Sequence, residues 1–179
     1  EFHLQNTIPF VDKFIIVDDH SEIPLNESDF MEPRGSIVQV KRPDKWLGVA
    51  GSRNYALKQL EDCDYIFLMD DDLLPKSPDW IPMHVKALSD KFCKIDLLVH
   101  YPNSLGECLS YRNGAIYAGV TATLSSTATL FAMTRYCLAI LGGFDSTMGY
   151  YGHEDTDYFT SARKLGVLPP EGYWTLIDS

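Results

Sequence analysis

Three consecutive aspartates, Asp70, Asp71 and Asp72, directly follow the apolar run 65–69. Adjacent carboxylates repel one another and titrate as a coupled set, so a cation is expected beside them. In an extended chain alternate side chains share a face, and Asp70 and Asp72 can therefore point together. Two carboxylates on one face make a hard-oxygen site that suits Mg²⁺ or Mn²⁺, which predicts a divalent-metal site here. A solvated acidic turn is the alternative.

A second acidic group, G-H-E-D-T-D at residues 152–157, stands at the start of a predicted helix. Acidic residues in the first turn of a helix stabilise it through the helix dipole, so simple capping explains them equally well. A carboxylate held in that position can also act as a general base on an acceptor hydroxyl.

Two further segments carry polar groups beside apolar runs. Asp18 and Asp19 end the β-branched run 14–17, and the segment G-V-A-G-S-R-N spans residues 48–54. The glycines of 48–54 precede a helix, but their spacing is neither a dinucleotide fingerprint nor a Walker loop. Arg53 is therefore open to two interpretations, a contact with a base or phosphate and an ion pair with an acidic residue.

The elements that must position these groups alternate between short strands and helices. Strands are predicted at 14–17, 37–40, 65–69, 95–99, 128–133 and 174–177, and helices at 49–60, 80–92, 134–141 and 154–165. This alternation predicts an α/β fold with a mostly parallel sheet. Ligands of such sheets bind beyond the carboxyl ends of the strands, where Asp18-Asp19 and the aspartate triplet both lie. We expect the two acidic clusters to share one rim of the sheet.

Composition and charge limit the classes of function. The chain has 179 residues, 45% of them hydrophobic, and a formal net charge of −10. These numbers suit a single globular domain and argue against a nucleic-acid partner, which needs a basic face. An anionic ligand needs a metal or a local basic group in so acidic a protein. No apolar run is long enough to span a membrane, and the scattered cysteines, like the absence of a signal-peptide pattern, favour the cytoplasm over secretion.

Taken in order, the segments resemble the inverting glycosyltransferases of family 2, which have the GT-A fold. The matching pieces are F-I-I-V-D-D-H-S (14–21), G-V-A-G-S-R-N-Y-A (48–56), Y-I-F-L-M-D-D-D-L-L-P (65–75), G-G-F-D (142–145) and G-H-E-D-T-D-Y-F (152–159). The last piece is similar to the galactosyltransferase and chondroitin-polymerase branch, in which G-G-E-D is usual and His153 here replaces a glycine.

The resemblance implies a role for each matched residue. It assigns the nucleotide to Asp18, Asp19, Ser21, Arg53, Asp70 and Asp71, with Asp19 toward a uracil base. It assigns a Mn²⁺ or Mg²⁺ ion to the D-x-D pair, Asp70 and Asp72. Asp155 would be the catalytic base, and His153 and Glu154 would bind the acceptor. The implied donor is a nucleoside-diphosphate sugar, most simply a UDP-sugar, and the implied acceptor is a carbohydrate or glycoconjugate.

The resemblance also implies one GT-A domain over residues 1–179, or a fragment of one, with a nucleotide-binding part at about 1–75 and an acceptor-binding part at about 76–179. The chain shows no counterpart of the family's first strand, so we expect either an unpaired edge or gap in the sheet beside the nucleotide site, or another segment in that position. No histidine occupies the place of the further metal ligand that many relatives contribute.

Two other functions remain open at this point. One is a non-catalytic nucleotide-sugar or carbohydrate-binding module of the same fold. The other is a phosphatase of the haloacid dehalogenase type, in which D-x-D after a strand supplies nucleophile and acid. That motif normally continues with Thr or Val where this chain has Leu74, and it normally lies near the start of its domain.

Overall fold

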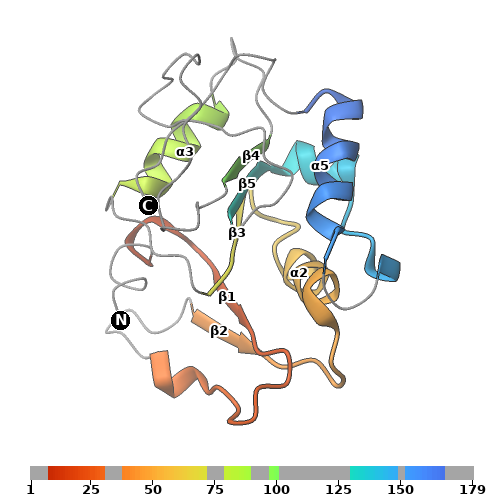
Figure 1. Cartoon of the computed structure of the whole chain (residues 1–179). Helices are drawn as coiled ribbons and strands as arrows, with labels where there is room; N and C mark the ends of the chain where they lie inside the picture. The colour runs from red at the N-terminus through yellow and green to blue at the C-terminus, as the bar shows by residue number, and fades with distance from the viewer. Residues whose placement is uncertain are drawn as a thin grey trace, which may run out of the picture.

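The computed structural model of the chain describes residues 8–30, 38–71, 79–89, 97–100, 130–148 and 152–167 (Figure 1). Its strands are β1 (Phe14–Val17), β2 (Val38–Lys41), β3 (Tyr65–Met69), β4 (Leu97–His100) and β5 (Leu130–Thr134). Its α-helices are α2 (Gly48–Gln59), α3 (Trp80–Ser89), α4 (Arg135–Leu141) and α5 (Glu154–Leu165). Short 3-10 turns are η1 (Ile8–Phe10), η2 (Glu27–Phe30) and η3 (Ser146–Met148). No described helix is both long and apolar enough to cross a membrane.

Most of these elements lie where the sequence predicts them. β1, β3 and α5 have the predicted bounds, and β2, β5 and α2 differ by one or two residues. α4 begins one residue later than predicted because Thr134 is its N-cap, with a hydroxyl that accepts the N–H of Cys137 at 3.1 Å. Gly166 ends α5 in the left-handed conformation that glycine favours at a helix C-terminus. The predicted strand 174–177 and the end of the predicted helix 80–92 lie outside the described residues.

The described strands form two sheets. β1 pairs with β2 in parallel, whereas β5 lies between β3 and β4 and runs antiparallel to both. The fold is mixed α/β, but a mostly parallel sheet is not found among the described strands because β5 reverses direction. Among the described strands β1 and β3 are not paired, although residues of both line the same cavity.

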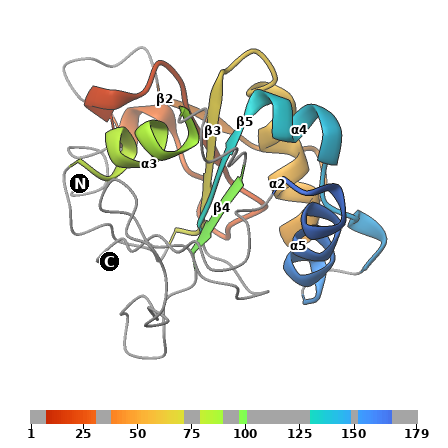
Figure 2. The same ribbon diagram turned by 90° about the horizontal axis from the view of Figure 1, so that it is seen from above.

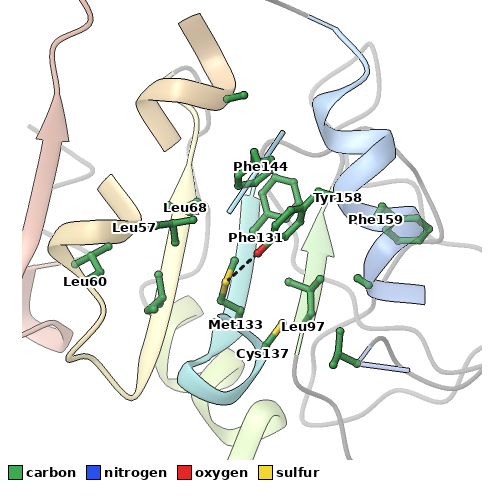
Figure 3. Packing of buried hydrophobic residues seen from close by; sticks show 14 residues of the cluster. Leu57, Leu60, Leu68, Leu97, Phe131, Met133, Cys137, Phe144, Tyr158 and Phe159 are labelled. Atoms are coloured by element: carbon green, nitrogen blue, oxygen red, sulfur yellow. Dashed lines mark hydrogen bonds between the residues drawn. The ribbon is translucent and has the colours of Figure 1, made fainter. Parts of the chain in front are cut away.

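The larger sheet is covered on both faces, as Figure 2 shows, with α3 on one side and α2, α4 and α5 on the other. Strand alternation divides the apolar residues between the two faces. Phe131 and Met133 of β5 belong to the core under α2, α4 and α5, whereas Leu130 and Ala132 pack with Trp80 under α3. In the first of these cores, shown in Figure 3, the rings of Phe144 and Tyr158 are stacked with centroids 4.1 Å apart. The ring of Tyr158 also lies edge-to-face against Phe131, with centroids 5.8 Å apart, so this packing fixes α5 against β5.

Candidate functional site

Asp18, at the end of β1, is buried and bound to the protein on both carboxylate oxygens. It accepts the N–H of Ser21 at 2.8 Å and of Leu25 at 3.1 Å, and it pairs with Arg42. The N–H of Ser21, more than the other donors, holds the pKa of Asp18 well below its usual range. Asp18 thus fastens the start of the loop after β1, and its predicted contact with a nucleotide stays a prediction.

Asp19 caps α2 from outside the helix. Its two oxygens accept the N–H groups of Leu47 at 2.8 Å and Gly48 at 2.8 Å. The N-cap residue Leu47 makes no side-chain capping bond, so Asp19 supplies the acceptor that the helix start lacks. This link joins residues 28 and 29 positions apart, and its only local sign in the sequence is a helix that begins after an apolar residue. Asp19 nevertheless lines the central cavity, as Ser21 does.

Arg53, on α2, joins the aspartate triplet after β3 to the acidic start of α5. One guanidinium nitrogen lies 2.9 Å from Asp70 Oδ1 and another donates to Asp155 Oδ1. The guanidinium carbon also lies 5.3 Å from the ring centre of Phe131 and 5.2 Å from that of Phe144. Burial alone would lower the pKa of Arg53, but Asp155 and then Asp70 outweigh burial and raise it. Of the two interpretations of Arg53, the ion pair is therefore present, with two partners.

The next residue, Asn54, fixes the G-G-F-D segment against α2. Its amide donates to the carbonyl of Phe144 at 2.8 Å and accepts the N–H of Phe144 at 2.7 Å. The sequence alone assigns Asn54 no role, although it lies in the segment 48–54 that also carries Arg53. Arg53 and Asn54 together bind one turn of α2 to the C-terminal part of the described chain.

Asp70 follows β3 and keeps 37% of its side chain exposed, while Asp71 is exposed and Asp72 lies outside the described residues. Among the residues that the structure describes, no three of the metal-binding types His, Cys, Asp and Glu lie close enough to hold an ion. A magnesium-like ion needs only one or two carboxylates when substrate phosphates and water complete its shell, so an exposed Asp70 fits such an ion. The buried hydroxyl of Ser52, one residue before Arg53, has no hydrogen-bond partner within the described part of the chain and lines the same cavity.

Glu154 and Asp155 begin α5 and are both buried, whereas His153 is exposed. Carboxylates are stabilised at that helix end by the dipole, which supports the capping explanation alongside the chemical one. His153 has φ = 70°, in the left-handed region that glycine adopts without strain. The backbone at this position therefore has the conformation that the glycine of G-G-E-D would favour.

The predicted site residues line one cavity of about 1740 Å³. Every candidate residue that the structure describes lines it: Asp18, Asp19, Ser21, Arg53, Asp70, Asp71, His153, Glu154 and Asp155. The cavity runs along β1 and β3, between the two sheets. Asp18, Asp19, Asp70 and Asp71 line this one cavity, which agrees with the expectation that the ends of β1 and β3 share a rim.

The sequence matches the family described as glycosyl transferase family 2 over residues 4–123, about two thirds of the chain. The chain belongs to glycosyl transferase family 2. Membership removes the haloacid dehalogenase alternative. A comparison with curated proteins found no match.

Solved structures similar to the chain give the fold of this family 2 member. The mannosyltransferase PcManGT from Pyrobaculum calidifontis, in complex with GDP-Man and Mn²⁺, has a TM-score of 0.56 and 18% identity, and the match covers 90% of this chain and 46% of that one. GalNAc-T7 with UDP, GalNAc and Mn²⁺ has a TM-score of 0.60 and 15% identity, and the match covers 86% of this chain and 35% of that one. The chain thus has the GT-A fold and spans less than half the length of either protein.

Proposed function

We propose that the chain is a metal-dependent inverting glycosyltransferase that moves a sugar from a nucleoside-diphosphate sugar, UDP-linked, to a hydroxyl of a carbohydrate or glycoconjugate. The observation that carries the proposal is one cavity lined by the carboxylates that follow β1, those that follow β3 and those that begin α5. Two of these carboxylates, Asp70 and Asp155, pair with Arg53 inside it. Family membership supports the reaction class. Two similar structures were solved with GDP-Man or UDP together with Mn²⁺, which supports the donor and the metal.

The donor would lie along the rim formed by the ends of β1 and β3. Asp19 and Ser21 would face the base. Arg53 would approach the diphosphate, and Asp70 and Asp71 would contact the ribose. Asp70 and Asp72 would hold the Mn²⁺ or Mg²⁺ ion. Such an ion, when bound, stabilises the negative charge that develops on the departing diphosphate.

Asp155 would act as the general base. Its carboxylate would take the proton of the acceptor hydroxyl while the acceptor oxygen forms its bond to the anomeric carbon. The bond from that carbon to the diphosphate breaks in the same step, and the nucleoside diphosphate leaves. Attack opposite the leaving group inverts the anomeric centre. Glu154 and His153 would bind the acceptor, an assignment supported by the likeness of the E-D segment to the galactosyltransferase and chondroitin-polymerase branch.

The test compares Asp155→Asn with the matched control Asp157→Asn, which removes the same charge two residues further along α5. Sugar transfer from UDP-sugars to a panel of acceptors is expected to fall by at least about 10³-fold in Asp155→Asn and to stay within a fewfold in Asp157→Asn. Calorimetry with UDP is expected to detect binding with saturating Mn²⁺ in both variants and none with EDTA. Transfer by Asp155→Asn at the unaltered rate would remove Asp155 from the mechanism.

The non-catalytic binding module remains the second candidate, and one observation favours it. Asp155 is paired with Arg53, and a carboxylate paired with a guanidinium is a weaker proton acceptor than a free one. Metal-dependent binding of UDP without transfer to any acceptor of the panel would support this candidate and contradict the enzyme.

A further inference from the structure

Arg53 is one cation shared by two carboxylates that belong to different parts of the chain. Asp70 is 17 residues away in sequence, at the end of β3, and Asp155 is 102 residues away, in the first turn of α5. The side chain of Arg53 is only 11% exposed and lies against the rings of Phe131 and Phe144. These rings restrict the guanidinium to a position between the two acids.

A divalent cation on Asp70 has to compete with Arg53 for the same carboxylate. The cation and the guanidinium also repel one another, because both would lie against the same carboxylate. The strength with which Arg53 holds Asp70 therefore sets part of the cation affinity. That strength depends on Asp155, because the negative charge of Asp155 attracts the guanidinium from the other side.

We propose that Arg53 couples the cation site at Asp70 to Asp155, so that pairing with Asp155 draws the guanidinium from Asp70 and raises the affinity for a divalent cation. The inference rests on the proposed function, since it takes Asp70 as a cation ligand. Coupling of this kind is reciprocal, so a bound cation also changes how Arg53 holds Asp155. Arg53 is then a positioning residue: it makes the contacts of the proposed base, Asp155, depend on whether a cation is bound at Asp70.

The test is a calorimetric titration of Mn²⁺ alone, without nucleotide or acceptor, near neutral pH. In Asp155→Asn the guanidinium has lost one ionised partner and holds Asp70 more strongly, so the Mn²⁺ affinity is expected to fall about three- to tenfold. Asp157→Asn removes the same charge from the same helical turn without a described bond to Arg53. Its affinity is expected to change by less than about twofold.

Variants of Arg53 test whether Asp155 acts on the cation through the guanidinium or only through its own negative charge. Arg53→Gln frees Asp70 from the guanidinium, so its Mn²⁺ affinity is expected to equal or exceed that of the unaltered chain, whereas loss of a merely structural residue would lower it. When Asp155→Asn is added to Arg53→Gln, the further loss of Mn²⁺ affinity should be no larger than the loss that Asp157→Asn causes in the unaltered chain. Should Arg53→Gln fail to fold, Arg53→Lys keeps the charge without the planar fork, and the effect of Asp155→Asn should fall by at least half in that background.

The outcomes distinguish the inference from the proposed function. Equal Mn²⁺ affinity in Asp155→Asn and the unaltered chain would overturn the coupling while leaving the metal-dependent transferase intact. An equal loss in Asp155→Asn and Asp157→Asn would also overturn it, because the effect would be long-range charge alone. Failure of the unaltered chain to bind Mn²⁺ alone would overturn the coupling, whereas the metal assignment would still be decided by the Mn²⁺-dependent binding of UDP, because substrate phosphates complete the shell of such an ion.

Discussion

The side-chain amide of Asn54 satisfies both backbone polar groups of Phe144, with bonds of 2.8 Å and 2.7 Å across 90 residues of sequence. Phe144 is itself buried and stacked on Tyr158 of α5. The pair therefore fixes the loop before α5 to the helix that carries Arg53, and it indirectly sets where Asp155 lies.

Asn54→Ala is expected to destabilise the fold by about 2–4 kcal/mol, because it leaves the buried N–H and C=O of Phe144 without their partner. Asn54→Asp is the matched variant: it can still accept the N–H, but it places a carboxylate against the carbonyl of Phe144. Urea unfolding followed by circular dichroism measures both free energies. A loss below about 0.5 kcal/mol in Asn54→Ala would show that the loop holds itself in place.

Gly143 provides a second test of the same contact. A Cβ at this position would lie 2.4 Å from Asn54 Oδ1, closer than any van der Waals contact permits. Gly143→Ala is therefore expected to destabilise the fold by about 1–3 kcal/mol. In the Asn54→Ala background the clash is absent, and the cost of Gly143→Ala should be mostly lost in a double-mutant cycle of unfolding free energies. Full additivity of the two changes would contradict a contact between them.

His84 predicts a pH dependence of stability. It is buried on α3 beside Phe67 and Trp80, and burial lowers its pKa to about 4, although a bond to the Trp80 carbonyl acts in the opposite direction. The unfolded chain takes up a proton near pH 6.5 and the native chain only near pH 4. Stability from this group is therefore complete above about pH 6.5 and falls by about 3 kcal/mol as the pH drops toward 4.

His84→Phe keeps an aromatic ring against Phe67 and removes the titrating group, so the fall in unfolding free energy between pH 6.5 and 4 should be smaller by about 3 kcal/mol. The control His20→Asn removes an exposed histidine instead. Urea titrations at several pH values give the comparison. Identical pH dependence in His84→Phe and the unaltered chain would mean that His84 does not stay neutral in the native state.

The local sequence determined the elements that local patterns encode. The runs 14–17 and 65–69 and the helical pattern 154–165 carry their periods and boundary residues within themselves, and the structure has β1, β3 and α5 at those bounds. The position of the acidic residues at the carboxyl ends of β1 and β3 was likewise readable from the sequence, whereas the burial of Asp18 was not. Asp72 is outside the described residues, so its role stays a prediction.

The tertiary structure alone decided which of these groups meet. Three features depend on segments far apart in the chain. β5 lies antiparallel between β3 and β4, Asp19 caps α2, and Arg53 holds both Asp70 and Asp155. Hydrophobic periodicity specifies which face of an element is buried, but not which distant element covers it, because many partners satisfy the same apolar face. The choice of partner is fixed only when the whole core packs, and with it the shared position of Arg53.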